Sequence, residues 1–300
     1  AAMIAAARRF FDERGVVEVD TPALSAAAAS DLHIASLQTR VWIDRATPFY
    51  LQSSPESAMK RLLAAGSGPI FQFARVFRDG EAGPRHNPEF LLLEWYRPGA
   101  GVAALMDEVA ALVAKLLGSE ALVERLSYRE AFMKHVGIDP FSATLEEIGD
   151  LCRRVGFNQA LDDRNAGLDL LLARRIQPAL GAGRVFVYDF PADQAAMARV
   201  RPGNPPLAER FELFVDGVEV ANGYQELTDA REQRRRMEAD GARRRETGLS
   251  PVPPDFRLLE ALEHGLPECA GVALGFDRLV GLKAGVEDIR RVMAFPIDRA

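Results

Sequence analysis

Residues 71–96, with the sequence FQFARVFRDGEAGPRHNPEFLLLEWY, decide the fold. Apolar and β-forming residues dominate residues 70–76 and again residues 90–96, whereas residues 78–88 are polar and contain glycine and proline. Two strands that are joined by a loop of this composition pair side by side in opposite directions. The stretch therefore predicts an antiparallel hairpin with a long loop that carries Arg78 and His86.

A second hairpin is predicted at residues 211–220, where FELFV and VEV flank Asp216-Gly217, because Asp-Gly adopts the positive φ angles of a type I′ turn. Further strands are predicted at residues 16–19, 184–190 and 272–274, and helices at residues 3–14, 56–65 and 276–282, with another that Thr228 and Asp229 cap and that runs to about residue 246. The sequence thus predicts an α+β fold with a mostly antiparallel sheet flanked by helices. We expect one domain over residues 1–300, with a helical insertion at about 103–178.

The composition argues against several classes of protein. The chain has 37 Lys and Arg against 43 Asp and Glu, and its net charge of −6 argues against binding nucleic acid mainly through the phosphate backbone. No lysine follows a glycine, so a Walker-type phosphate loop is absent, as are GxGxxG, GxSxG and HExxH. No apolar run is long enough to cross a membrane. Cys152 and Cys269 form no CxxC pair, which fits reduced thiols in the cytoplasm.

Three segments resemble the motifs of class II aminoacyl-tRNA synthetases. The first is the opening helix and strand that end at Pro22, the second is the hairpin with Arg78, and the third runs from Gly271 to Arg278 as strand, glycine, helix and arginine. Ser54-Pro55-Glu56 and residues 219–227 are similar to the lysyl-tRNA synthetase subclass. The resemblance covers essentially the whole chain. It implies a class II synthetase-like catalytic domain and a homodimer that forms through the first motif.

From the length of 300 residues we expect no N-terminal anticodon-binding domain like that of a lysyl-tRNA synthetase. The sequence instead resembles the stand-alone paralogues of that enzyme, on residues 77–78, 86–91, 93–98, 226–233 and 298–300. This resemblance implies that the protein activates (R)-β-lysine, and more weakly α-lysine, with ATP and Mg²⁺, and transfers it to the ε-amino group of a lysine on elongation factor P. It also implies a cytoplasmic protein that binds neither tRNA nor a membrane.

Two alternatives remain open at this point. One is a truncated enzyme that charges tRNA as lysyl-tRNA synthetases do. The other is a non-catalytic paralogue that binds an amino acid or an adenylate. An ATP–pyrophosphate exchange assay separates the second alternative from both enzymes.

The expected chemistry explains the residue types of the nucleotide site. When a carboxylate attacks the α-phosphorus and pyrophosphate leaves, negative charge collects on phosphate oxygens, which guanidinium groups bind with several donors at once. By resemblance, Arg78 holds the substrate carboxylate and the α-phosphate, Arg278 lies on the γ-phosphate, and these two are the catalytic residues. The implied ATP-binding residues are Arg78, Asp79, Gly80, His86, Asn87, Glu219, Val220, Gly275 and Arg278. Glu212 and Glu219 match a pair that binds Mg²⁺.

The amino-acid site is expected to be acidic, because carboxylate and phenol oxygens are suitable acceptors for an ammonium group. By resemblance, Glu226 and Tyr96, with Glu94 behind them, bind the distal ammonium, and Glu56 and Asn222 lie near the amino and carboxylate end. The implied substrate-binding residues are Ser54, Pro55, Glu56, Glu94, Tyr96, Asn222, Glu226 and Ala273.

Two positions depart from the lysyl-tRNA synthetase pattern. Ala273 stands where the family has glycine, and its methyl group is expected either to favour a shifted amino group, as in β-lysine, or only to fill space. After Arg78 the family reads Arg-x-Glu, but this chain has Gly80 and then Glu81. Either Glu81 compensates through a changed loop path, or one ATP contact is lost. The arginine-rich residues 231–245 are expected to form a solvated helix face or a docking surface for an acidic partner.

Overall fold

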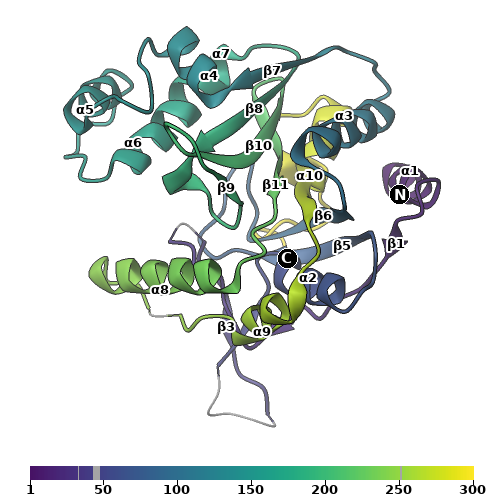
Figure 1. Ribbon diagram of the computed structural model, residues 1–300. Coiled ribbons are helices and arrows are strands. Elements are labelled where there is room, and N and C mark those ends of the chain that lie inside the picture. The colour runs from purple at the N-terminus through teal and green to yellow at the C-terminus, as the bar shows by residue number, and fades with distance from the viewer. Residues whose placement is uncertain (33, 43–47, 251) are drawn as a thin grey trace.

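The computed structural model describes residues 1–32, 34–42, 48–250 and 252–300. A nine-stranded sheet runs through the described chain (Figure 1). Its strands are, in order across the sheet, β1 (Val17–Glu18), β5 (Ile70–Phe77), β6 (Glu89–Pro98), β12 (Cys269–Gly275), β11 (Val218–Gln225), β10 (Leu207–Val215), β8 (Arg184–Pro191) and β7 (Val123–Ser127), and β9 (Val200–Arg201) pairs with β10. Only the β1–β5 and β7–β8 pairs of this sheet are parallel, so the predicted mostly antiparallel α+β fold is confirmed.

The helices lie in groups around this sheet (Figure 1). They are α1 (Ala2–Asp12), α2 (Glu56–Ala64), α3 (Val102–Leu117), α4 (Tyr128–His135), α5 (Leu145–Arg154), α6 (Arg164–Leu171), α7 (Gln177–Ala179), α8 (Ala230–Glu246), α9 (Phe256–Gly265) and α10 (Phe276–Ala284), with a short π-helix η1 (Leu172–Ile176) and two 3-10 helices, η2 (Ala192–Gln194) and η3 (Ile289–Arg291). Figure 1 shows α4 to α7 at one end of the molecule and α8 and α9 at the other. No described helix is both long and apolar enough to cross a bilayer.

Both predicted hairpins are observed. β5 and β6 pair antiparallel from Ile70↔Tyr96 to Phe77↔Glu89, and residues 78–88 connect them. β10 and β11 meet at Asp216 and Gly217, whose φ angles are +50° and +70°, as a type I′ turn requires. The β10–β11 turn is specified locally, because both of its central residues tolerate a positive φ. Strands β6 and β11 then pair on either side of β12.

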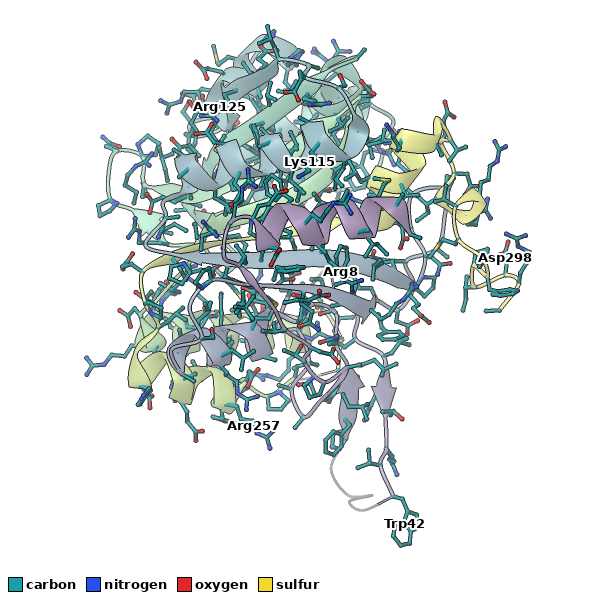
Figure 2. All side chains as sticks on the ribbon, turned by 90° about the vertical axis from the view of Figure 1, so that its right-hand side faces the viewer. Arg8, Trp42, Lys115, Arg125, Arg257 and Asp298 are labelled. Carbon is teal, nitrogen blue, oxygen red and sulfur yellow. The ribbon has the colours of Figure 1, made fainter. Side chains whose placement is uncertain are left out.

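Aromatic packing fixes α1 against the central strands. The rings of Phe11 and Phe71 stack with centroids 4.4 Å apart, and Trp95 contacts Phe11 edge-on at 5.3 Å. Figure 2 shows α1 between α3 and the strands β5 and β6. A second apolar cluster, which includes Tyr128 and Phe190, joins α4 to β8. These clusters hold the centre of the sheet in a fixed position.

Several strands, β9 among them, were not predicted from the sequence. Residues 123–127, inside the stretch expected to be mostly helical, form β7 and pair in parallel with β8. A small separate sheet of β2 (Leu24–Ser25), β4 (Phe49–Leu51) and β3 (Gln38–Thr39) also lies outside the predicted strands. It ends in a projection on which Trp42 is 84% exposed (Figure 2).

Candidate active site

Two adjoining cavities open over the centre of the sheet. The inner cavity, of about 320 Å³, is lined by Ser54, Glu56, Glu94, Tyr96, Glu226 and Ala273. The outer cavity, of about 1430 Å³, is lined by Asp163, Asp169, Arg210, Glu212, Glu219 and Arg243. Arg78 and Asn222 line both cavities and mark the place where they meet.

Glu94 on β6 is the centre of a hydrogen-bond network in the inner cavity. The Tyr96 hydroxyl donates to Glu94 Oε1 at 2.6 Å, and the Ser54 hydroxyl donates to Oε2 at 2.8 Å. Burial raises the pKa of Glu94 to about 7, and the nearby Glu56 adds to the rise. This carboxylate is therefore poised to ionise fully when a cation approaches it.

Glu226 follows β11 and forms a second acidic group of the inner cavity. Its Oε2 lies 2.5 Å from Nζ of Lys60, and its Oε1 has no hydrogen-bond partner among the described residues. Burial raises the pKa of Glu226 to about 8 although Lys60 acts in the opposite direction. The Tyr224 hydroxyl donates to Glu56 Oε1 at 2.8 Å. Sequence reasoning did not single out Lys60 or Tyr224, and the spacing of Glu56 and Lys60 on one helix face was the available signal.

Strand β12 provides the floor of the inner cavity through small residues. Gly271 pairs with Tyr96 on one side and Tyr224 on the other, and Ala273 pairs with Glu94 and Asn222. A Cβ atom at Gly271 would lie 2.3 Å from Glu226 Oε1 and 2.4 Å from Tyr96 Cε1. Only glycine therefore allows these two side chains their present positions.

Pro55 contributes to the inner cavity indirectly. It is buried at the N-terminus of α2, immediately before Glu56. Its ring restricts φ immediately before the helix that carries both Glu56 and Lys60.

Arg78 follows the end of β5 and begins the hairpin loop. Its Nε donates to the Ser53 carbonyl at 3.4 Å, its guanidinium lies 5.1 Å from the centroid of the Phe90 ring, and its Nη1 lies 3.8 Å from Glu81 Oε1. Gly80 has a φ of +74° and its amide donates to Asp79 Oδ1, so the loop turns sharply here. The turn places Glu81 beside Arg78 in the wall of the outer cavity.

Arg278 lies on α10, on the other side of the same loop. Its Nη1 donates to the Glu219 carbonyl at 3.0 Å, its Nε donates to the Arg85 carbonyl at 3.2 Å, and its Nη2 lies 2.9 Å from His86 Nε2. Burial lowers the pKa of His86, and the charges of Arg278 and Arg78 lower it further. A neutral imidazole accepts a hydrogen bond from the guanidinium. The hairpin loop thus brings both arginines close to His86; Arg78 lines both cavities, whereas Arg278 is not among the residues that line either of them.

Glu212 and Glu219 face the same cavity because of a bulge. The β10–β11 pairing shifts register between Leu213 and Phe214. In a regular strand, Glu219 and Asn222 would point to opposite faces, because they are three residues apart. With the bulge, Glu219 lines the outer cavity together with Glu212. Glu212 is ion-paired with Arg210 at 2.5 Å. Burial raises its pKa to about 7, Arg210 opposes the rise and Glu219 adds to it.

These two carboxylates fit a magnesium ion that is also held by phosphates. Mg²⁺ prefers oxygen ligands and is commonly bound through one or two carboxylates together with substrate phosphates. Among the described residues, no group of three or more His, Cys, Asp or Glu is arranged to hold a metal without such help.

Three of the expected nucleotide residues are placed differently from the rest. Asn87 is buried, its Nδ2 donates to the Glu89 carbonyl, and its Oδ1 accepts from the Ile297 amide at 3.0 Å, so its side chain ties the loop to the C-terminal segment. The Val220 side chain packs in the core. At Gly275 a Cβ atom would meet only the side chain of Arg278, at 3.5 Å or more, so space does not require glycine there.

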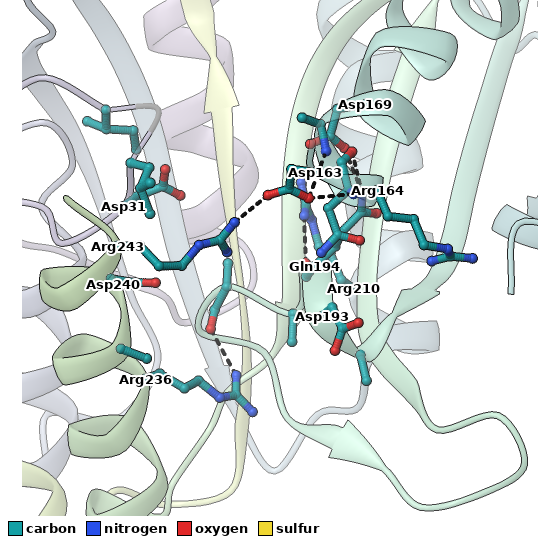
Figure 3. Close-up of a pocket in the computed structure, with 18 of the residues that line it drawn as sticks. Asp31, Asp163, Arg164, Asp169, Asp193, Gln194, Arg210, Arg236, Asp240 and Arg243 are labelled. Carbon is teal, nitrogen blue, oxygen red and sulfur yellow. Dashed lines mark hydrogen bonds and ion pairs between the residues drawn. The ribbon is translucent and has the colours of Figure 1, made fainter. Parts of the chain in front are cut away.

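The arginine-rich helix α8 forms one wall of the outer cavity rather than only a solvated face (Figure 3). Arg243 is ion-paired with Asp163 at the start of α6, across the cavity. Arg236 donates to the carbonyls of Ala196 and Ala198, both at 2.8 Å. These arginines therefore bind groups of the same chain.

Comparison with known proteins identifies the family of this chain. A family model described as "tRNA synthetases class II (D, K and N)" matches residues 1–299. Relatives named elongation factor P--(R)-beta-lysine ligase are 46% identical in Edwardsiella ictaluri and in Klebsiella pneumoniae, and 47% identical in Sodalis glossinidius. Each alignment covers 100% of this chain and 94% of the relative. The chain therefore belongs to the class II tRNA synthetase family of the D, K and N group.

Proposed function

We propose that this protein is an ATP-dependent ligase that activates (R)-β-lysine as an adenylate and transfers it to the ε-amino group of a lysine on elongation factor P. One observation carries the proposal: relatives that are 46% identical over the whole chain have the name of that ligase. The inner cavity supports it, because Glu56, Glu94 and Glu226 gather beside Arg78, as a substrate with two ammonium groups and one carboxylate requires.

In the first step, the carboxylate of the amino acid attacks the α-phosphorus of ATP and the bond to pyrophosphate breaks. Arg78 lies where the two cavities meet, so it would bind the substrate carboxylate on one side and the α-phosphate on the other. Arg278, beside Glu219 and the hairpin loop, would bind the terminal phosphates. Magnesium held by Glu212 and Glu219 would neutralise phosphate charge.

In the second step, the ε-amino group of the acceptor lysine attacks the acyl carbon and AMP leaves. This reaction does not require any side chain to form a covalent intermediate. Catalysis rests on positioning and on charge stabilisation, which Glu94 and Glu226 supply at the amino-acid end and the two arginines at the phosphate end.

The test is mass spectrometry of elongation factor P after incubation with this protein, ATP and each lysine isomer. We expect one lysine to gain the mass of a lysyl group, with (R)-β-lysine faster than α-lysine. ATP–pyrophosphate exchange without any modified elongation factor P would contradict the acceptor. Charging of tRNA-Lys would support the truncated-synthetase alternative, and no exchange at all would support the non-catalytic one.

We further infer that the protein works in the cytoplasm as a homodimer that pairs along α1 and β1. The exposed Val17 of β1, with 56% of its surface accessible, gives this edge an apolar contact. Analytical ultracentrifugation of the wild type and of Val17→Asp tests the dimer. A variant that sediments like the wild type would place the interface elsewhere.

A further inference from the structure

Lys60 is a buried cation directly behind the inner cavity. It lies on α2, is 1% exposed, and places its Nζ 2.6 Å from Glu56 Oε1 and 2.5 Å from Glu226 Oε2. The ring centroid of Tyr224 is 5.6 Å from the same Nζ. Both contacted carboxylates line the inner cavity, so Lys60 joins two walls of that cavity from outside it.

The charges around Lys60 balance in a specific way. Glu56, Glu94 and Glu226 influence one another and Lys60. When all four groups are ionised, three negative charges and one positive charge leave a local charge of −2. A buried charge is stable only when it is compensated, and a diamino acid brings two ammonium groups.

We propose that Lys60 is a positioning residue that holds Glu56 and Glu226 toward the inner cavity and sets its charge to match an amino acid with two ammonium groups. This inference rests on the proposed function, because it concerns the amino-acid site of that reaction. It accounts for the unpartnered Oε1 of Glu226: one oxygen of this carboxylate faces Lys60 and the other remains for the substrate.

The groups that face Glu226 and Lys60 come from several elements. They are Glu56 on α2, Glu94 and Tyr96 on β6, Tyr224 on β11 and Cys269 on β12. Burial lowers the pKa of Lys60, but the charges of Glu226 and Glu56 more than offset this and the net pKa is raised. Lys60 therefore stays charged, and its removal would raise the pKa of the remaining carboxylates.

The experiment compares Lys60→Met with the wild type in ATP–pyrophosphate exchange from about pH 6 to 9. We expect the KM for (R)-β-lysine at neutral pH to rise about 100-fold, as for removal of one partner of a buried charge pair. The KM for ATP should stay within about threefold. The midpoint of the pH profile of kcat/KM for the amino acid should move to higher pH.

Two matched variants define what this shift means. Lys60→Arg keeps the charge, so its pH midpoint should stay near that of the wild type and its KM should rise less. Lys134→Met removes an exposed lysine, 53% accessible and paired with Glu124, and should behave as the wild type. A folded Lys60→Met protein with an unchanged pH midpoint would overturn the inference, as would a shifted midpoint in Lys60→Arg.

If Lys60→Met does not fold, the double variant Lys60→Met/Glu226→Gln removes both members of the pair. The inference expects this protein to fold and to bind ATP, because Glu226 is neutralised and Glu56, which also loses Lys60, keeps the hydrogen bond from the Tyr224 hydroxyl. Failure of both variants to fold would assign Lys60 to stability and overturn the inference. A wild type without β-lysine exchange would contradict the proposed function instead, so the two failures are distinguishable.

Discussion

At the scale of single residues, Gly271 leaves room for the side chains of Glu226 and Tyr96 in the inner cavity. A Cβ atom there would lie 2.3 Å from Glu226 Oε1 and 2.4 Å from Tyr96 Cε1. We expect Gly271→Ala to displace both side chains and to raise the KM for (R)-β-lysine about 100-fold or more in ATP–pyrophosphate exchange, because the ammonium would lose its partners.

Gly275→Ala is the matched comparison, four residues further along the chain in β12. Its new methyl group would meet only the Arg278 side chain, at 3.5 Å or more, so the amino-acid site should keep its shape. Any loss should therefore be in the KM for ATP. Equal effects of the two alanines on the KM for the amino acid would argue against Gly271 as the residue that shapes this cavity.

A substitution at Ala273 tests what determines the preference between the two lysine isomers. Its methyl group lines the inner cavity between Glu94 and Asn222. If this methyl group favours a shifted amino group, Ala273→Gly should improve α-lysine relative to (R)-β-lysine by about tenfold in kcat/KM, the size of effect of one methyl group in a pocket. An unchanged ratio in ATP–pyrophosphate exchange, with normal folding, would leave Ala273 a packing residue.

Site residues could be predicted from the sequence where they belong to a short motif. They could not be predicted where their role depends on a contact between distant parts of the chain. Ser54, Glu94, Tyr96 and Glu226 were expected in one site from their motifs, and they line one cavity. The spacing of Glu56 and Lys60 indicated only a local ion pair, and the role of Lys60 also depends on Glu226, far away in sequence, so that role could not be predicted. The position of Glu81 depends on the left-handed turn at Gly80, which only the loop path reveals.

At the scale of elements, Asp163 joins two helices that form the outer cavity. Its Oδ1 accepts from the amides of Asn165 and Ala166 at the start of α6, and its Oδ2 is paired with Arg243 on α8. We expect Asp163→Ala to lower the free energy of unfolding by about 1 kcal/mol, mainly through loss of the cap. Chemical denaturation measures this difference.

Asp163→Asn separates the cap from the ion pair. Asparagine keeps the capping oxygen but not the charge, and an exposed ion pair contributes little, so this variant should lose at most about 0.5 kcal/mol. Arg243→Ala should match it. An asparagine variant that is as unstable as the alanine variant would show that the contact between α6 and α8 matters more than the cap.

Elements with local signals were predictable from sequence, and elements that depend on distant partners were not. The turn at Asp216-Gly217 is encoded by two residues that accept positive φ angles. Strand β7 has no such signal: it is short, it lies among helices, and it exists because Val123 to Ser127 pair with β8. The sequence predicted a solvated face for α8 because the contact with α6, which comes from another part of the chain, has no local signal.

At the scale of the whole molecule, the fold gathers acidic groups from separate elements into a buried site at a cost in stability. Burial raises the pKa of Glu94 to about 7 and that of Glu226 to about 8, whereas the unfolded chain ionises them near 4.5. Between these values the unfolded state binds fewer protons than the folded state. Stability contributed by these groups therefore falls as the pH rises from about 4.5 to 8.

A diamino acid should reverse this loss, because its ammonium groups stabilise the ionised carboxylates in place of protons. We expect the increase in melting temperature with saturating (R)-β-lysine to be larger at pH 8 than at pH 6, by about 2 °C or more. Differential scanning fluorimetry measures it, and Glu226→Gln, which keeps the size of the side chain and cannot ionise, should reduce the difference. An equal shift at both pH values would mean that the substrate does not meet Glu94 and Glu226 as ionised partners, and the amino-acid site would have to be sought in another part of the two cavities.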